Sequence, residues 1–435
     1  MYRISRFVRV AKDNNRIVLY NYRTGGLYFE HANSLESKEL LGIINGNIDE
    51  KSDLFEALLS REFLVRENEN EYETLKQQYE NYKLRNVDST IRLTIFVNEM
   101  CNFQCVYCYE ENDGGEIEQH TLDGIICFLK SLVDTATKTI VISWFGGEPL
   151  LSISKIVEFM NIVRSEFTDL HIMSSVTTNG YLLEPSVHSL LQNAGVNEYQ
   201  ITVDSFEHDM FRKTRSGEPS FEKIIENIRT VLASNSPSKI NLRININPAI
   251  YSRIFEFLDY VKTFANDYLT IHFHPIADMG GCVSSSVICD QNFFMNALPD
   301  LNRYCQDNHL STDITYGMLC PFSGSCYAGL EKSFAIDCHG VIRKCTVDYR
   351  GIENVVGYIE DSTHFTLLQE SNKIWCMNHS FNNQTCQNCE KLPVCYGAAC
   401  PLKAVRGQFD CNKNVCVEES IILQASYNVD FQESN

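Results

Sequence analysis

Short apolar runs alternate with longer amphipathic segments through the middle of the chain. We expect strands at residues 92–97, 139–145, 171–177, 199–203, 241–246 and 270–273. Between them, apolar residues recur at helical spacing, for example over residues 122–132, 153–167 and 221–232. Alternating strands and helices from about residue 88 to residue 310 are typical of a parallel α/β sheet. Six such units predict a partial α/β barrel, in which chemistry takes place at the carboxyl ends of the strands.

The first 85 residues have a different pattern and predict a small separate unit. Two alternating segments, 16–20 and 26–29, flank turn residues and indicate a β-hairpin. Residues 37–44 and 53–59 have apolar positions at helical spacing, and residues 63–65 indicate a short strand. The polar segment 67–82, rich in Glu, Gln, Asn and Tyr, predicts a solvated helical linker.

Composition places the chain among soluble globular proteins of two or three domains. It has 435 residues, of which 44% are hydrophobic and 21% charged. The 37 basic against 56 acidic residues leave a net charge of -19, which argues against binding to nucleic acid or to an anionic membrane. The N-terminal sequence lacks the apolar core of a signal peptide, and no later apolar run approaches bilayer length. We therefore expect a cytoplasmic protein.

Cysteine is abundant and unevenly placed. Of the 18 cysteines, four lie before residue 280 and eleven lie between Cys320 and Cys416. The cytoplasm keeps thiols reduced, so metal clusters are the use that remains for so many of them. This distribution predicts a cluster-rich C-terminal domain over about residues 315–435.

Three cysteines follow the first predicted strand with C-x3-C-x2-C spacing, at Cys101, Cys105 and Cys108. Three thiolates on one loop can hold three irons of a 4Fe-4S cluster and leave the fourth iron open to a small molecule. The alternative is a structural zinc knuckle, which requires four closed ligands, commonly paired as C-x2-C. The spacing, the aromatic Tyr107 and the preceding strand favour the cluster.

At these residues the chain resembles the radical S-adenosylmethionine (radical SAM) superfamily. The resemblance implies that the open iron binds the amino and carboxylate groups of SAM. An electron from the cluster would then split the sulfonium and give a 5'-deoxyadenosyl radical. It also implies that residues 88–310 form the partial (β/α)6 TIM-like barrel of that superfamily.

Further segments at predicted strand ends resemble the signatures of the same superfamily in the expected order. They are Trp144-Phe-Gly-Gly-Glu-Pro149, Thr177-Thr-Asn-Gly180, Ile201-Thr-Val-Asp-Ser205 and His208-Asp-Met-Phe-Arg212. The resemblance implies a methionine-amino contact at Glu148, a ribose contact at Thr202, a carboxylate contact at Arg212 and backbone contacts to adenine at Asn245. With them, the expected cofactor-binding residues are Tyr107, Gly146, Gly147, Glu148, Thr202, Arg212 and Asn245. Each segment alone could be an ordinary turn or cap, but their order argues against coincidence.

The C-terminal cysteine array resembles the SPASM domain, which carries two auxiliary 4Fe-4S clusters. The resemblance implies one cluster on Cys320, Cys326, Cys345 and Cys400, and another on Cys386, Cys389, Cys395 and Cys416. Two departures are present: the gap from Cys395 to Cys400 is one residue longer than usual, and Cys411 competes with Cys416. Zinc ribbons would fit Cys386-x2-Cys389 alone, but do not explain why the array accompanies a radical SAM core.

The order of elements in the first 85 residues resembles the PqqD-like recognition element, a winged-helix-like unit. In related maturases that element pairs a leader peptide onto the edge of its hairpin, which is recognition by strand addition. The alternative is an N-terminal domain that only caps the barrel.

Taken together, the chain resembles a radical SAM/SPASM peptide maturase with three cofactor clusters in addition to SAM. This implies hydrogen abstraction from a ribosomally made precursor peptide, thioether formation, and an electron donor such as flavodoxin or ferredoxin. Carbon-carbon or carbon-oxygen cross-linking and epimerisation remain open. No catalytic residue follows, because nothing ranks the polar residues His339, Asp348 and Tyr327 near the array.

Two other functions are weighed against this one. Anaerobic sulfatase-maturating enzymes share the barrel motifs and the array, but carry an aspartate where this chain has Thr346 after Cys345, and lack the N-terminal unit. A non-catalytic iron-sulfur electron-transfer protein would need neither the Gly146-Gly-Glu-Pro149 segment nor the one that ends at Arg212.

Overall fold

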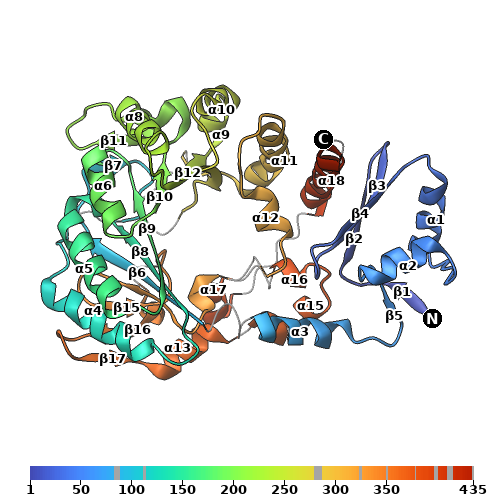
Figure 1. Cartoon of the computed structure of the whole chain (residues 1–435), viewed down its shortest axis with the longest axis horizontal. Coiled ribbons are helices and arrows are strands. Elements are labelled where there is room, and N and C mark those ends of the chain that lie inside the picture. The colour runs from blue at the N-terminus through green and yellow to red at the C-terminus, as the bar shows by residue number, and fades with distance from the viewer. Residues whose placement is uncertain are drawn as a thin grey trace.

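The computed structural model describes residues 1–82, 89–110, 114–278, 287–322, 326–348, 351–377, 379–395, 400–408 and 415–433. A barrel of strands and helices fills one side of the molecule, and the N-terminal unit lies on the other (Figure 1). The C-terminal segments run beneath the barrel and then between these two parts (Figure 1).

Six parallel strands form the barrel in the order β6-β8-β9-β10-β12-β13. They are β6 Thr90–Asn98, β8 Thr139–Gly146, β9 His171–Thr178, β10 Glu198–Thr202, β12 Lys239–Ile246 and β13 Leu269–Pro275. These are the six predicted strands, and each end lies within two residues of its predicted position. Along β8, Ile140, Ile142 and Trp144 are buried, whereas the residues between them line the barrel interior. The period of two therefore separates packing side chains from side chains that face the cavity.

Helices follow the strands and cover the outer face of the sheet (Figure 1). They are α4 Gln119–Leu132, α5 Ile153–Glu166, α6 Pro185–Asn193, α8 Phe221–Leu232, α10 Ile254–Lys262 and α11 Gln291–Asp307, with the short α7 His208–Phe211 and α9 Pro248–Tyr251. In α8 the apolar residues Ile224, Ile228 and Val231 share one face and are fully buried, as helical spacing requires. A small two-stranded sheet, β7 Phe103–Cys105 with β11 Arg212–Thr214, stands at the barrel mouth.

The barrel sheet continues into the cysteine-rich segment, which sequence analysis did not anticipate. β14 Ser333–Ile336 pairs parallel with β6, and β15 Val341–Arg343, β16 Val355–Ile359 and β17 Phe365–Leu367 follow antiparallel. The result is one ten-stranded sheet. Cys345, which is buried, follows two residues after β15, and the next residue, Thr346, lines the barrel cavity.

Short helices and one long helix complete the C-terminal part. They are α12 Ile314–Leu319, α13 Gln369–Cys376, α14 His379–Asn382, α15 Gln384–Gln387, α16 Leu392–Cys395, α17 Pro401–Val405 and α18 Val415–Glu433. α18 lies between α11 and the N-terminal sheet (Figure 1).

The N-terminal unit contains a three-stranded antiparallel sheet of order β2-β3-β4. Its elements are β1 Tyr2–Ile4, β2 Val8–Lys12, β3 Arg16–Asn21, β4 Leu27–His31, α1 Leu35–Ile44, α2 Asp53–Ser60 and β5 Leu64–Arg66. β3 and β4 form the predicted hairpin, while β1 and β2 were not predicted, and β5 pairs with β1. Ser34 and Ser52 cap α1 and α2 by accepting from Ser37 N and Phe55 N.

The predicted solvated linker is a helix, α3 Glu71–Tyr82, but one of its faces is buried. Leu75 packs with Phe7 of the N-terminal unit and with Phe381 and Leu392 of the cysteine-rich segment. The expectation of a fully solvated linker is therefore wrong. The apolar side of α3 is too short, with one buried leucine, to stand out in a polar sequence.

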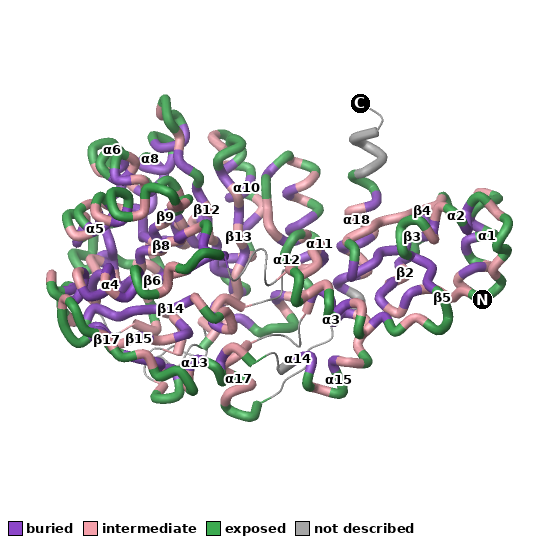
Figure 2. The backbone as a smooth tube through the Cα atoms, turned by 60° about the horizontal axis from the view of Figure 1, so that its bottom comes forward, coloured by how far each residue is buried: buried purple, intermediate pink, exposed green. Residues whose placement is uncertain are grey.

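Buried residues run continuously through the barrel strands and into the face of the N-terminal sheet that meets α18 (Figure 2). A second, separate core lies between the other face of that sheet and the helices α1 and α2. Among the described residues, no helix is both long enough and apolar enough to span a bilayer.

Candidate active site

A cavity of about 580 Å³ opens inside the barrel at the carboxyl ends of its strands. Its wall includes Cys101, Cys105 and Cys108, and the predicted cofactor-binding residues Tyr107, Gly146, Gly147, Thr202, Arg212 and Asn245. Residues separated by up to 144 positions in sequence are thus brought to one wall because parallel strands present the same end to the same side.

The loop with the three cysteines is held by the small sheet at the barrel mouth. Cys105 stands opposite Arg212 in the β7–β11 pair, and Cys108 N donates to Cys105 O at 3.2 Å. Arg215 Nε donates to the carbonyl of Cys101 at 2.9 Å. These contacts turn the loop so that its three thiols gather at one place.

The three thiols lie close enough to influence one another. Burial raises the pKa of Cys101 to about 12 and that of Cys105 to about 11, and neighbouring thiols contribute to both shifts. Without metal these two groups are therefore protonated at neutral pH, and metal binding releases their protons. No fourth cysteine lines this cavity among the described residues. The donor set fits three irons of a 4Fe-4S cluster with one iron left for another ligand.

Gly146 and Glu148 organise the segment after β8. Gly146 has φ +122°, and a Cβ at this position would lie 2.1 Å from the carbonyl oxygen of Asn98. Only glycine therefore lets β8 approach the end of β6 this closely. Gly147 N in turn donates to the carbonyl of Asn98 at 3.2 Å.

The Glu148 carboxylate is fully buried and accepts three hydrogen bonds, from Thr178 Oγ1, Asn179 N and Leu150 N at 2.7–3.0 Å. It thus joins the Gly-Gly-Glu-Pro segment to Thr178-Asn-Gly180 at the next strand end. Because these bonds already occupy it and it does not line the cavity, a direct contact with the SAM amino group remains a prediction. Its observed role is to position both segments.

A second polar network surrounds Tyr107 and Arg212 at the cavity wall. Tyr107 OH donates to the buried Asp204, and accepts from Asn245 Nδ2 at 3.0 Å and from Arg212 Nη1 at 3.1 Å. Burial raises the pKa of Asp204, and Arg212 counteracts this shift. Burial alone would lower the pKa of Arg212, but Cys105, Tyr107 and Asp204 outweigh it, so the pKa of Arg212 is raised and the guanidinium stays charged. Asn245 N donates to Asp204 at 3.1 Å, so the predicted adenine contact cannot use this N–H.

One donor of this network has no partner. Arg212 Nε is buried and makes no hydrogen bond within the described part of the chain, although Arg212 lines the cavity. A cation with a spare donor at this place fits a carboxylate ligand such as that of SAM. Thr202, at the end of β10, lines the same wall.

Several cavity residues were not found by sequence analysis. His274 at the end of β13 lines the wall, as do Tyr109 and Glu110 directly after the cysteine loop. His274 Nδ1 lies 2.7 Å from the carbonyl of Pro275, which can only accept, so this nitrogen carries the proton. Strand-end position is the one signal that could have indicated His274.

The cysteine-rich segment contributes to the cavity as well. Tyr327 and Thr346 line it, and their hydroxyls lie 2.7 Å apart. Thr346 N also donates to Tyr327 OH at 3.0 Å. At the position after Cys345 this chain therefore has a neutral hydroxyl that is hydrogen-bonded to Tyr327, and not a carboxylate.

Three of the four cysteines expected on the first auxiliary cluster lie together. Burial, together with the neighbouring thiols of Cys345 and Cys400, raises the pKa of Cys326 to about 11. Cys345 and Cys400 interact in the same way. Cys320 directly follows α12, and Tyr20 OH donates to the carbonyl of the neighbouring Leu319 at 2.7 Å. No disulfide links the described cysteines.

The second expected set is described in part. Cys386, Cys389 and Cys395 lie on and between α15 and α16, and Cys389 N donates to Cys386 O at 2.9 Å. Cys411 and the side chain of Cys416 lie outside the described residues. Both auxiliary ligand sets therefore remain predictions.

Part of the chain is similar to known enzymes. Residues 95–248 match the family model described as the radical SAM superfamily. Over 91% of its length, and 88% of the relative, the chain is 23% identical to "Radical SAM cyclopropyl synthase TigE" of Paramaledivibacter caminithermalis. It is 33% identical over 171 residues to "Probable GTP 3',8-cyclase" of Methanocaldococcus jannaschii, covering 38% of this chain and 54% of that one.

Two solved structures share the fold. "Native anSMEcpe with bound AdoMet and Cp18Cys peptide" superposes with TM-score 0.62 and 17% identity over 78% of this chain and 99% of that one. Streptococcus suis SuiB bound to precursor peptide SuiA superposes with TM-score 0.53 and 16% identity over 93% of this chain and 97% of that one. Residues 95–248, which carry the cysteine loop and most of the strand ends around the cavity, therefore form a radical SAM domain, and members of that superfamily are enzymes that use SAM and a 4Fe-4S cluster.

Proposed function

We propose that this enzyme modifies a ribosomally made precursor peptide by hydrogen abstraction and forms an intramolecular thioether from a peptide cysteine. The observation that carries the proposal is the cavity that gathers the cysteine loop, six of the seven predicted SAM residues and the Tyr327–Thr346 pair. SAM and the cluster would supply the carbon-centred radical that abstracts the hydrogen.

The chain's own residues would bind the cluster and SAM, orient them, and shield the reactive intermediate from water. Cys101, Cys105 and Cys108 would hold the cluster, and Arg212 Nε would donate a hydrogen bond to the SAM carboxylate. The barrel wall and the segment that bears Tyr327 and Thr346 enclose the cavity, which keeps water away from a reactive intermediate.

A peptide substrate is supported by the N-terminal unit and by the relatives. SuiB, solved with a precursor peptide, matches 93% of this chain, against 78% for anSMEcpe. β4 is an edge strand of the N-terminal sheet, and an edge strand offers backbone groups for strand addition. We propose that residues 1–85 recognise the leader peptide there.

The remaining parts of the chain would support electron transfer. We propose that residues 315–435 form an auxiliary-cluster domain, with one cluster on Cys320, Cys326, Cys345 and Cys400 and one on Cys386, Cys389, Cys395 and Cys416. Fully ligated clusters suit electron transfer. Residues 88–310 would be the catalytic barrel, reduced by a flavodoxin or ferredoxin.

Two other products have a specific observation in their favour. A carbon-carbon cross-link is favoured by the relative named cyclopropyl synthase, which aligns with 91% of this chain. Formylglycine formation is favoured by the fold shared with anSMEcpe. Against it stands Thr346, a neutral hydroxyl that bonds to Tyr327 where a carboxylate base would be needed.

The experiment is anaerobic co-expression with a cysteine-bearing peptide encoded beside the gene, followed by mass spectrometry before and after thiol alkylation. A thioether predicts loss of two hydrogens and a cysteine that no longer alkylates. Loss of two hydrogens with an alkylatable cysteine indicates a carbon-carbon or carbon-oxygen bond. Deuterium uptake with no other mass change indicates epimerisation, and conversion of cysteine to an aldehyde indicates formylglycine.

The matched control replaces Cys101, Cys105 and Cys108 with alanine in the same chain. This variant should release no 5'-deoxyadenosine and leave the peptide unchanged. If the unaltered enzyme releases 5'-deoxyadenosine but the peptide keeps its mass and its hydrogens, the peptide-maturase proposal is wrong.

A further inference from the structure

Glu99, Cys338 and His339 form a cluster of potential metal ligands outside the SAM cavity. One ligand atom from each lies within 4.8 Å of the other two, and Glu99 Oε2 is 3.4 Å from His339 Nε2. The residues are far apart in sequence but meet because β14 pairs parallel with β6, with Ile336 opposite Ile95. Glu99 follows the end of β6, and Cys338 and His339 follow the end of β14.

The turn after β14 is fixed in a way that presents both of its ligands. The Asp337 carboxylate accepts from His339 N at 3.0 Å and from Val341 N at 2.8 Å. Gly340 has φ +81°, a left-handed conformation that suits glycine. Cys338 is 4% exposed, whereas the side chain of His339 is 64% exposed. The thiol is thus held rigidly while the imidazole can adjust.

Glu99 is fixed from the other side. Its N–H donates to the carbonyl of Gly115 at 2.9 Å. A Cβ on Gly114 would lie 1.8 Å from Glu99 Oε2, so a glycine at that position leaves the space that the carboxylate occupies. The Glu99 carboxylate therefore packs against Gly114 and points to the turn after β14.

We propose that Glu99, Cys338 and His339 bind one divalent cation of the zinc class, with the fourth position taken by water. A thiolate, an imidazole and a carboxylate are the ligands that zinc accepts at bond lengths of about 2.0–2.3 Å. In a tetrahedral site such bonds separate the ligand atoms by roughly 3.3–3.8 Å. The 3.4 Å pair already has this spacing, and rotation of the exposed His339 supplies the remaining contraction.

The proposed ion would join two parts that matter to the active site. Glu99 lies two residues before Cys101, at the start of the cysteine loop. Cys338 and His339 lie in the turn that leads through β15 to Cys345. A bound ion would tie the cysteine loop to the segment that carries Tyr327 and Thr346. The proposal is independent of the substrate and of the bond formed.

The test uses the full-length, cluster-loaded enzyme under anaerobic conditions with zinc sulfate as the probe. After desalting, zinc and iron per chain are measured by mass spectrometry, and zinc ligation by X-ray absorption at the zinc edge. The unaltered enzyme should retain about one zinc per chain with one sulfur ligand. Cys338→Ser and His339→Gln should each weaken zinc binding by at least about tenfold without changing the iron content.

Cys127→Ser is the matched control, because Cys127 lies on α4, where its thiol donates to the carbonyl of Thr363. It should retain zinc like the unaltered enzyme. His339→Gln also guards against misfolding, since His339 is exposed and its loss leaves the core intact. Equal zinc retention by His339→Gln and the unaltered enzyme, or no retained zinc in the latter, overturns the proposal and leaves an ordinary ion pair between Glu99 and His339.

Discussion

At the scale of single residues, the site depends on backbone positions as much as on ligands. Gly146 permits the contact between the ends of β6 and β8, and Gly147 N then donates to the same Asn98 carbonyl. Asn98 Nδ2 donates in return to the carbonyl of Glu148 at 3.0 Å. Hydrogen bonds in both directions between Asn98 and the segment after β8 therefore fix this part of the cavity wall.

Gly146→Ala should disrupt these hydrogen bonds. Its Cβ would meet the Asn98 carbonyl at 2.1 Å in a conformation that side chains rarely adopt, so we expect a loss of about 3 kcal/mol or more in the free energy of unfolding. SAM affinity should fall as well. Gly217→Ala is the control, because Gly217 has φ +82° but no atom within 4 Å of an added Cβ. It should cost about 1 kcal/mol, measured by urea unfolding and by SAM titration. Equal losses in the two variants would mean that the contact with Asn98 is unimportant.

His274 should make stability depend on pH. Burial and the neighbouring Arg243 and His272 lower the pKa of His274 to about 4 from 6.5. Between these values the unfolded chain binds a proton that the folded chain rejects, so stability falls as the pH falls from 6.5 to 4. The full effect is on the order of 3 kcal/mol.

The measurement compares urea midpoints of the unaltered chain and of His274→Gln from pH 7 to pH 4.5. The variant should lose less stability over this range. His171→Gln, at an exposed position on β9, should follow the unaltered chain. Identical curves for all three proteins would show that His274 does not titrate in this window.

Sequence analysis predicted those site residues that belong to short contiguous motifs. The three cysteines, Gly146 and Thr202 belong to short segments that end predicted strands, and all of them line the cavity. Asp204 lies in one of these segments, Ile201-Thr-Val-Asp-Ser205, but the segment does not reveal its partners, and His274 lies in none of them. Asp204 acquires its role from Tyr107, Arg212 and Asn245, which only the folded barrel brings near it.

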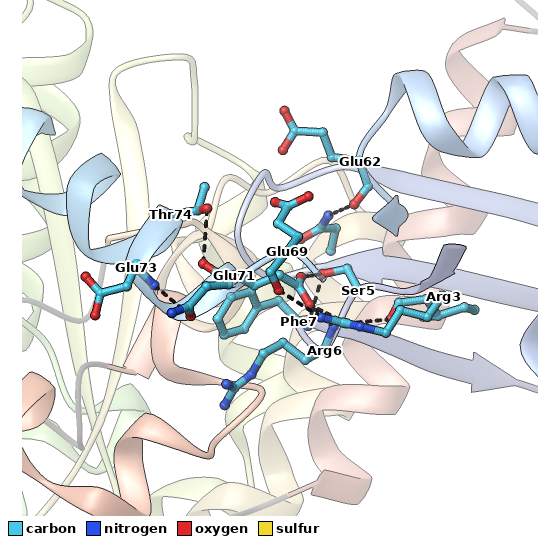
Figure 3. A network of polar contacts seen from close by, with 12 residues as sticks. Arg3, Ser5, Arg6, Phe7, Glu62, Glu69, Glu71, Glu73 and Thr74 are labelled. Carbon is cyan, nitrogen blue, oxygen red and sulfur yellow. Dashed lines mark hydrogen bonds and ion pairs between the residues drawn. The ribbon is translucent and has the colours of Figure 1, made fainter. Parts of the chain in front are cut away.

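At the scale of elements, α3 shows how one buried charge can anchor a polar helix. The Glu71 carboxylate, at the start of α3, accepts from Ser5 Oγ, from Arg6 N at 3.0 Å and from Arg3 Nη1 at 2.5 Å (Figure 3). Arg6 also donates through its guanidinium to the Gln387 carbonyl in the cysteine-rich segment. The helix thereby fixes β1 and the following turn against α15.

Glu71→Ala should loosen this junction. Two N–H donors and a hydroxyl would lose a buried charged acceptor, which costs about 1–3 kcal/mol. We expect amide hydrogen exchange in residues 2–22 and 71–82 to rise by roughly tenfold, measured by mass spectrometry. Glu73→Ala is the control, since Glu73 is exposed on the same helical turn (Figure 3). A rise in exchange spread evenly over the barrel would contradict a local role.

The elements that sequence analysis missed have a common physical cause. β14 to β17 contain three to five residues each, too few for a periodic pattern to stand out. The pairing of Ser333 with Arg92 joins strands that are distant in sequence, and no local signal encodes it. By contrast, the barrel strands of five to nine residues were predicted to within two residues at each end.

At the scale of the whole molecule, α18 joins the N-terminal unit to the rest of the chain. Ile421 and Ile422 are fully buried in the main core. That core also contains Val18 of β3 and Tyr22, which directly follows β3. Tyr22 OH donates to Glu418 on α18 at 2.8 Å, and Glu418 is paired with the buried Lys391 at 2.5 Å. The last helix thus links the first sheet to the cysteine-rich segment.

Arg16 tests whether this link makes the molecule unfold as one unit. Arg16 is 5% exposed and donates through Nη1 to the Ser426 carbonyl of α18 at 2.7 Å. Its guanidinium carbon lies 3.9 Å from the ring centre of Tyr427 and 4.7 Å from that of Phe29. One planar cation therefore bridges β4 and α18, a role that lysine cannot reproduce.

Arg16→Ala and Arg16→Lys should both uncouple the N-terminal sheet from α18. The lost hydrogen bond and ring contacts are together worth about 2–3 kcal/mol, so residues 1–66 should unfold at a lower temperature than the barrel. We expect calorimetry to give one transition for the unaltered chain and two for each variant, and hydrogen exchange to assign the earlier one to the N-terminal unit. Arg61→Ala is the matched control, because Arg61 also lies over a ring, at 5.9 Å from that of Tyr28, but is exposed and remote from α18. If Arg16→Ala keeps a single transition, the buried contacts of Ile421, Ile422 and Tyr22 hold the two parts together without the arginine.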